Sequence, residues 1–246
     1  MRINTLRLRA MLGWLGMLLP WIVAILIGDF PNSIFMIILS LALVLLISCK
    51  GYELLGILPL CIAAVLIGDF PDSISATWYT NACTVFMIIL GSASILLISY
   101  KGYERIDDII LTLSGVFGLC ICLFPCAIAG APEKVGTFLI DSSISNIIHF
   151  VSAIIFFALL AYNSFFLFTK SSGEVTGKKK IRNVIYRVCG VGMVASFVIM
   201  AFPYFPYQTW ITEALALFFF GISFLTKADI YPWLFCDTPY KEDEDG

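Results

Sequence analysis

The stretch LGMLLPWIVAILIGDFPNSI at residues 15–34 occurs a second time, with changes, as LGILPLCIAAVLIGDFPDSI at residues 55–74. The next stretch, FMIILSLALVLLISCKGYE at residues 35–53, recurs as FMIILGSASILLISYKGYE at residues 86–104. Thirteen of 20 positions are identical in the first pair and 14 of 19 in the second. Each copy is an apolar run, an acidic turn with Phe-Pro, a second apolar run and a basic turn. This order is typical of a membrane hairpin, and the sequence predicts that the hairpin is duplicated head to tail.

The composition indicates a membrane protein. Apolar residues make up 60% of the 246 positions and charged residues 13%, and the mean hydropathy is +0.97. In soluble domains about 25% of residues are charged. We therefore predict an all-α polytopic membrane helix bundle with no domain that could bind nucleic acid. It forms one domain over residues 1–236, in which the repeat pairs 15–53 with 55–104, followed by a short acidic cytoplasmic tail at 237–246.

Eight apolar runs approach or reach the roughly 17–25 residues that a membrane-spanning helix needs. They cover residues 10–28, 34–49, 54–68, 82–100, 109–129, 147–169, 184–202 and 210–226. We predict eight transmembrane helices, the first of them retained, because the basic N-terminus has no small-x-small cleavage site. Residues 33–69 could instead form a re-entrant hairpin, which would place Lys50 at mid-membrane at a cost of a few kcal/mol.

The distribution of lysine and arginine predicts the orientation. With eight spans and a cytoplasmic N-terminus, 14 of the 15 cationic residues fall in inner segments, and only Lys134 falls in an outer one. Cytoplasmic loops of membrane proteins carry this excess of positive charge. We therefore predict a multi-pass protein of the cell membrane with both termini in the cytoplasm.

The high identity of the two copies indicates a local duplication within a six-helix protein. The predicted fold is then a six-helix core plus one duplicated hairpin. The two copies have the same orientation, whereas alternating-access transporters are more often built from inverted repeats. The repeat by itself therefore does not predict a transport site.

Four ionisable side chains near the predicted outer face are candidates for a binding site. His149 is the only histidine and opens the sixth run, while Asp72, Asp141 and Glu213 lie in or beside outer turns. Ionisable groups in membrane segments are frequently functional. Each also has a structural interpretation. His149 could hydrogen-bond a neighbouring helix, Asp72 and Asp141 could accompany helix caps, and Glu213 could complement the dipole of a helix start.

The second copy of the repeat carries an insertion, SATWYTNACTV at residues 75–85, that is rich in aromatic residues. Trp78 and Tyr79 in this insertion could form the lip of an outward-facing pocket. Anchoring at the membrane interface is the alternative, because tryptophan and tyrosine are enriched there.

No catalytic or metal-binding constellation is present in the sequence. One histidine cannot supply a His-rich zinc site, and the chain has no GxSxG elbow and no P-loop. We predict no catalytic residues, no metal and no cofactor. Most cysteines fall in apolar runs and behave there as small apolar residues, while a Cys83–Cys126 disulfide on the outer face stays open.

The segments GLCICLFPC, ending at residue 126, and IIHFVSAIIFF at 147–157 give the second half a resemblance to a group of small six-helix membrane proteins. The group includes the damage-regulated autophagy modulator type and the GPI-anchor lipid-remodelling factors. The resemblance covers about residues 107 to 226. It implies a multi-pass protein with polar residues at its outer face and lipid handling, and it marks His149 as the position of interest.

Three functions follow as hypotheses. The first is a membrane protein that binds or moves a lipid or small amphipathic molecule at its outer face, with membrane lipids as its partners. The second is a lipid-modifying enzyme that uses His149 with Asp72 or Asp141. The third is an adaptor or scaffold whose helices pack against a partner. Convergence of His149, Asp72, Asp141 and Glu213 on one cavity would favour the first two hypotheses over the third.

Overall fold

The computed structural model describes residues 5–27, 71–80, 82–102, 104–170, 177–202, 204–205 and 207–228. Within these residues the chain forms six α-helices: α1 (Thr5–Ile27), α4 (Cys83–Ser99), α5 (Arg105–Leu123), α6 (Ser142–Tyr162), α7 (Gly177–Met200) and α8 (Gln208–Lys227). The prediction of an all-α fold is confirmed. The apolar runs 34–49 and 54–68, and with them the choice between spanning and re-entrant hairpins for 33–69, lie outside the described residues.

Three short elements complete the described chain. A 3-10 turn, η1 (Ser75–Tyr79), precedes α4, and a π-helical turn, η2 (Asn163–Leu167), extends α6. Strands β1 (Lys134–Val135) and β2 (Ile140–Asp141) pair antiparallel and lead into α6. The loop between α5 and α6 therefore ends in a small hairpin, which the sequence analysis does not anticipate.

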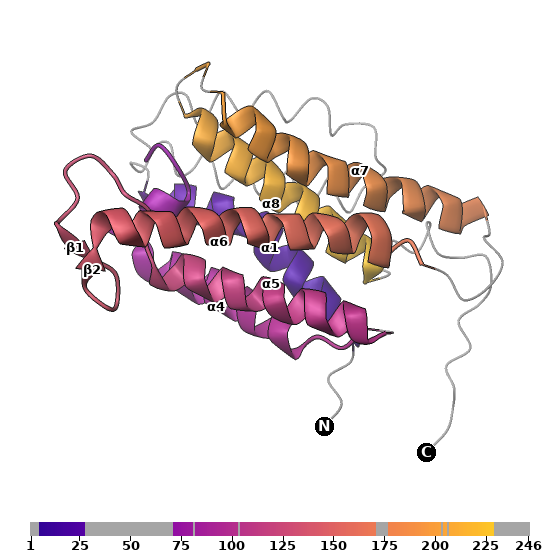
Figure 1. Cartoon of the computed structure of the whole chain (residues 1–246). Helices are drawn as coiled ribbons and strands as arrows, with labels where there is room; N and C mark the ends of the chain where they lie inside the picture. Colours follow the sequence, from indigo (N-terminus) through magenta and orange to yellow (C-terminus); the bar gives the residue numbers. More distant parts are fainter. Residues whose placement is uncertain are drawn as a thin grey trace.

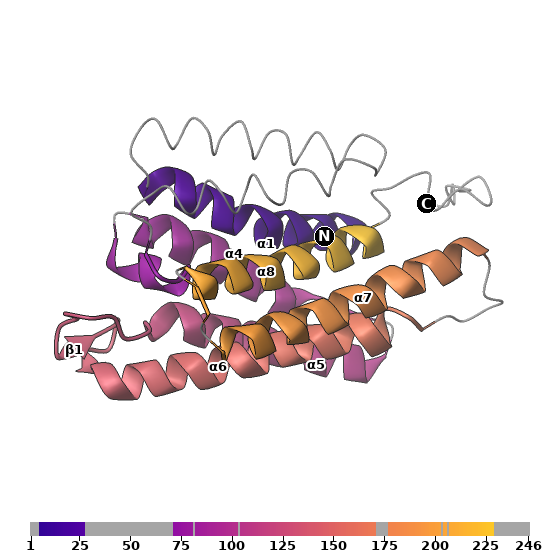
Figure 2. The same ribbon diagram turned by 90° about the horizontal axis from the view of Figure 1, so that it is seen from above.

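The six helices form a closed ring. Each contacts the next in the order α1, α4, α5, α6, α7, α8, and α8 returns to α1. Figures 1 and 2 show the helices lying lengthwise beside one another. Direct packing of α1 on α4 joins the first helix of one copy of the repeat to the second helix of the other. The six described helices thus pack as one bundle.

Four described segments are long and apolar enough to cross a membrane: Arg105–Leu123, Ser142–Leu167, Gly177–Met200 and Gln208–Lys227. The outer faces of α5, α6 and α7 expose large aliphatic side chains, such as the α7 row of Val184, Val188, Val191 and Val194. Exposed apolar faces of this size are unusual for a soluble protein and suit contact with lipid. The α8 segment is buried over most of its length and lies deeper in the bundle.

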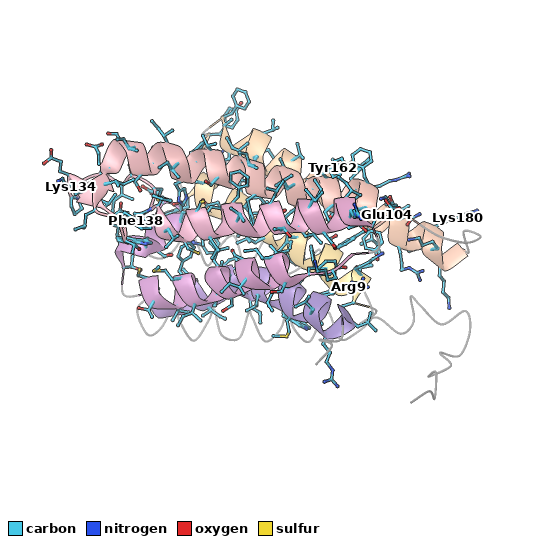
Figure 3. The ribbon with its side chains drawn as sticks, turned by 60° about the horizontal axis from the view of Figure 1, so that its bottom comes forward. Arg9, Glu104, Lys134, Phe138, Tyr162 and Lys180 are labelled. Carbon is cyan, nitrogen blue, oxygen red and sulfur yellow. The ribbon has the colours of Figure 1, made fainter. Side chains whose placement is uncertain are left out.

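Charge is segregated along the bundle axis. Figure 3 shows Arg9, Glu104 and Lys180 at one end of the molecule and Lys134 at the other. The starts of α1, α5 and α7, the end of α8, and Lys101 and Lys170 in the adjoining turns share the first end and include the other described lysines and arginines. Among the described residues, Lys134 is the one cation at the opposite end, as the sequence pattern predicts. After the orientation that the sequence predicts, we name the Lys134 end the outer end and the Arg9 end the inner end.

Glycines allow close approach of the helices, which the sequence analysis did not single out. A Cβ atom added at Gly221 of α8 would lie 2.8 Å from the carbonyl oxygen of Gly13 in α1. One added at Gly115 of α5 would collide with the carbonyl oxygen of Ser94 in α4. Small residues at helix crossings are typical of membrane bundles, where packing replaces the hydrophobic effect. The α1–α8 and α4–α5 pairs therefore depend on backbone contact.

Candidate functional site

A cavity of about 340 Å³ lies at the outer end of the ring. All six helices and the η1 segment contribute to its lining. Most of its wall is apolar, and its largest side chains are Phe86, Phe150, Phe156, Phe157, Phe197 and Met200. Its volume is at the lower end of the range for ligand-binding pockets, about 300–1,000 Å³.

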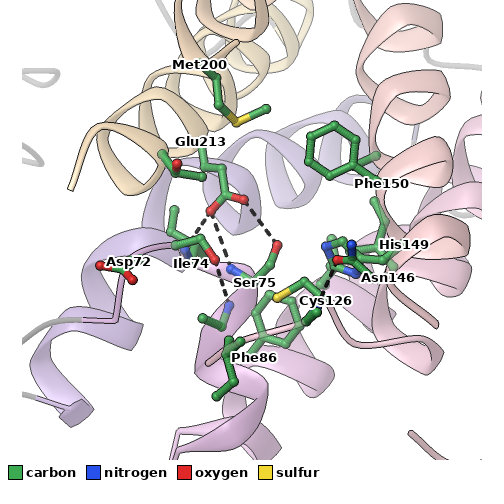
Figure 4. A pocket seen from close by; sticks show the side chains of 18 of the residues that line it. Asp72, Ile74, Ser75, Phe86, Cys126, Asn146, His149, Phe150, Met200 and Glu213 are labelled. Carbon is green, nitrogen blue, oxygen red and sulfur yellow. Dashed lines mark hydrogen bonds between the residues drawn. The ribbon is translucent and has the colours of Figure 1, made fainter. Parts of the chain in front are cut away.

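Glu213 of α8 lines this cavity and is half-buried. One carboxylate oxygen accepts the backbone N–H of Ile74 at 2.6 Å and that of Ser75 at 3.4 Å. The other oxygen accepts the Ser75 hydroxyl at 3.2 Å (Figure 4). Within the described part of the chain, no lysine, arginine or histidine forms an ion pair with it. Glu213 also lies beyond the first turn of α8, which begins at Gln208, so the interpretation of Glu213 as a helix-dipole residue is wrong.

His149 lines the same cavity from α6. Its side chain is 3% exposed, and its Nδ1 atom lies 2.8 Å from the carbonyl oxygen of Phe124, at the end of α5. This contact joins two neighbouring helices, which is the structural role considered for the histidine. In the neutral tautomer that carries its proton on Nδ1, the ring donates this hydrogen bond and Nε2 is an acceptor.

The other four predicted residues occupy different places. Asp72 is exposed and lines the edge of the cavity. Asp141 is exposed and lies outside the lining, where its side chain accepts the Ser143 N–H at 2.8 Å and caps α6. Trp78 and Tyr79 are partly buried in η1, and their rings pack edge to face with centroids 5.3 Å apart. The structure therefore brings His149, Asp72 and Glu213 to one cavity and leaves Asp141, Trp78 and Tyr79 outside its lining.

The sequence analysis missed several polar lining residues. Asn146 lies one helical turn before His149, and its side-chain oxygen accepts the N–H of Ala127 at 2.9 Å. Ser75 lines the cavity beside Glu213, and Cys126 lies between η1 and α6 (Figure 4). The spacing of Asn146 and His149 on one helix face could have identified the asparagine. No sequence pattern predicts that the loop at 124–129 packs against η1, so Ser75 and Cys126 could not have been identified together.

Cys126 has a free thiol, as has Cys83, so the two residues are not bridged. Burial, together with the nearby negative charge of Glu213, raises the pKa of the Cys126 thiol to about 11. The thiolate, not the thiol, is the nucleophile. Cys126 is therefore a poor nucleophile at neutral pH, although it faces the cavity.

Alkylation tests this state of Cys126. At pH 8 we expect Cys126 to react with iodoacetamide about a hundredfold more slowly than an ordinary thiol, because its pKa is higher by about two units. The rate should keep rising to about pH 11. Peptide mapping by mass spectrometry measures it, and a cysteine introduced by Ala129→Cys, at an exposed position of the same loop, is the control. Equal rates at the two positions at pH 8 would contradict the shift.

Among the described residues, His149 does not form an acid–base pair with a carboxylate of the cavity. The hydrogen bonds of the His149 ring run to backbone carbonyls of the α5 end, and no hydrogen bond joins it to Glu213 or Asp72. A general base has to reach its proton directly or through one water molecule. Among the described residues, no group of three His, Cys, Asp or Glu side chains is arranged to hold a metal ion. The cavity thus offers hydrogen-bonding groups and an apolar wall.

A second polar cluster closes the inner end. Arg9 donates to the Tyr100 hydroxyl at 2.7 Å and to the carbonyl oxygen of Lys227 at 3.3 Å. Lys179 donates to the carbonyl oxygens of Phe168 and Lys170 at 3.2 and 2.9 Å. Cations near helix ends satisfy unpaired carbonyls and complement the helix dipole. This cluster therefore ties the inner helix ends together.

The inner end also contains a small cavity beside the π-helical turn. Asn163 is fully buried there, and neither its side-chain nitrogen nor its side-chain oxygen has a partner. The cavity next to it measures about 10 Å³, which is near the lower limit for one water molecule. It is far smaller than the outer cavity and leaves no room for an organic ligand.

No protein-family model, no curated protein and no solved structure matches this chain.

Proposed function

We propose that this protein binds or moves a lipid or another small amphipathic molecule in its outer cavity. The observation that carries the proposal is the mixed lining of that cavity, which is mostly apolar and includes a few polar side chains. Phenylalanine and methionine side chains form the wall, and Glu213, Asn146, His149 and Ser75 supply polar groups. A molecule with an apolar chain and a hydrogen-bonding head group matches both parts.

The position of the opening supports access from the membrane. Phe150 lines the cavity from α6 and is 52% exposed, so the cavity reaches the surface beside that helix. The same helix exposes Ile147, Val151 and Ile154, which suit contact with lipid tails. A ligand could therefore enter sideways from the outer part of the bilayer without crossing an aqueous phase.

The proposal includes the finer topology that the sequence predicts. It places eight transmembrane helices in the cell membrane, with both termini in the cytoplasm and the cavity on the outer side. The segregation of described cations at the inner end supports this orientation. The resemblance to lipid-remodelling factors supports lipid as the class of ligand.

Binding is favoured over the two other hypotheses. An enzyme that uses His149 needs a carboxylate within reach, and the ring bonds to backbone carbonyls instead. A scaffold does not require a cavity whose wall combines apolar and polar side chains. We therefore retain one candidate function.

Photo-crosslinking tests the proposal on purified protein in lipid nanodiscs. A single-chain amphiphile with a diazirine in its chain should label peptides from residues 146–157 and 197–200, because these line the cavity. Excess unlabelled amphiphile should abolish this labelling. Labelling of the exposed valine row of α7 should persist, since bulk lipid contacts do not saturate. Labelling that no competitor reduces, or that spares the cavity peptides, would overturn the proposal.

A further inference from the structure

The charges of the outer cavity are of one sign. Glu213 lies inside it and Asp72 lies at its edge, and no lysine or arginine is among the described residues that line it. Lys134 is the one described cation at this end, and it belongs to β1, outside the lining. The remaining described cations lie at or toward the inner end. The ionisable groups that the described lining supplies besides His149 and Cys126 are therefore carboxyl groups, which disfavours an anionic head group.

Glu213 also retains capacity for a further hydrogen bond. An ionised carboxylate has about four lone-pair sites. Protein donors approach it three times, twice at one oxygen from Ile74 and Ser75, and once at the other oxygen from the Ser75 hydroxyl. The second oxygen can therefore accept from a ligand. Figure 4 shows the carboxylate directed toward Ser75 on the cavity side.

Asn146 and His149, two other polar residues of the cavity, each have one side-chain atom bonded to the backbone. The Asn146 side-chain oxygen accepts the N–H of Ala127, and the His149 Nδ1 atom faces the carbonyl oxygen of Phe124. A ligand that only accepts hydrogen bonds would leave the Glu213 carboxylate with its three protein donors and no ionic partner. A ligand that donates hydrogen bonds and carries positive charge would satisfy it.

From these observations we infer that the cavity selects amphiphiles whose head group is a primary amine, held by an ion pair with Glu213. This inference rests on the proposed function, since it specifies the ligand class of the same site. Long-chain amines and lipids with an exposed ammonium group have this chemistry. Fatty acids and phosphate-terminated lipids do not.

Competition against the photoactivatable amphiphile tests the inference. Three competitors share one sixteen-carbon chain and end in an amine, an alcohol or a carboxylate. We expect the amine to compete at least tenfold more strongly than the alcohol, and the carboxylate least of the three. The comparison uses the wild-type chain, so it does not depend on how a variant folds.

The variant Glu213→Gln then locates the effect. It should remove the preference for the amine over the alcohol, whereas Glu133→Gln, at an exposed carboxylate of the outer end, should keep that preference. Thermal unfolding confirms that both variants are folded. Equal competition by amine and alcohol, or a preference for the carboxylate, would overturn the inference and leave the proposed function standing. Failure of all three competitors would overturn the proposed function itself.

Discussion

Replacing Gly221 by valine is expected to separate α8 from α1 and to destabilise the whole bundle. A Cβ atom at this position would lie 2.8 Å from the carbonyl oxygen of Gly13 and 2.9 Å from the Cβ atom of Met17. The first of these atoms is backbone and cannot turn aside, so the helices have to move apart. Overpacking typically costs about 1–3 kcal/mol, and more where backbone has to shift. For a chain of this size we expect the melting temperature to fall by roughly 5–10 °C.

Gly91→Val is the matched control for Gly221→Val. Gly91 lies in α4, and a Cβ atom there would meet nothing within 4 Å. Both variants replace glycine by valine within a helix, so the change in helix propensity is the same in the two. Thermal unfolding in detergent and the fraction of monodisperse protein measure the difference. Equal loss in the two variants would show that the α1–α8 crossing does not depend on Gly221.

The sequence predicted the class of fold and the polarity of the bundle, but not the glycine contacts. Composition and the repeat are properties of whole segments, so they predict the fold class even where the orientation of single side chains cannot be predicted. Close approach depends on which glycine faces which helix. The pairs Gly13–Gly16 and Gly115–Gly118 have the short spacing of small residues that is common at membrane helix crossings. Their partners in α8 and α4 come only from the structure.

The predicted helix starts were late for α5, α6 and α7. The sequence analysis placed α7 at 184–202, whereas the helix begins at Gly177 and includes Lys178 to Lys180. Likewise α5 begins at Arg105, where Glu104 and Asp107 form a reciprocal capping box. An apolar run corresponds to the part of a helix that suits the hydrocarbon core of a membrane. The helix itself continues beyond this run through polar, capped turns. Helix boundaries predicted from apolar runs alone are therefore too short at such ends.

The candidate site was partly predictable. His149, Asp72 and Glu213 follow from their proximity to outer turns, and the closed ring brings them to one cavity. Asp141 shares that outer position, yet it caps α6 because the β1–β2 hairpin carries it away from the lining. The bonds from Ile74 and Ser75 to Glu213 span about 140 positions of the chain. No local pattern reports such a contact, so the sequence predicts Glu213 as a candidate without its hydrogen-bond partners.

Filling the cavity is expected to abolish ligand binding without loss of the fold. Ala153 lines the cavity from α6, in the turn after His149 and beside Phe150. A tryptophan at this position would occupy space between the apolar wall residues. We expect Ala153→Trp to weaken amphiphile binding by at least tenfold, because the chain of the ligand and the indole ring compete for the same volume.

Ile154→Trp is the control, since it adds the same ring at the next position of α6, where the side chain is half-exposed and outside the lining. It should change affinity by less than about twofold. Binding could be lost because the indole fills the cavity or because it disrupts the fold, and the melting temperature distinguishes these two causes. Filling a void stabilises a fold, whereas forcing a side chain into a packed core destabilises it. Weak binding by Ala153→Trp at an unchanged or raised melting temperature supports occupation of the cavity by the ligand. Undiminished binding by a folded Ala153→Trp variant would place the ligand elsewhere on the bundle.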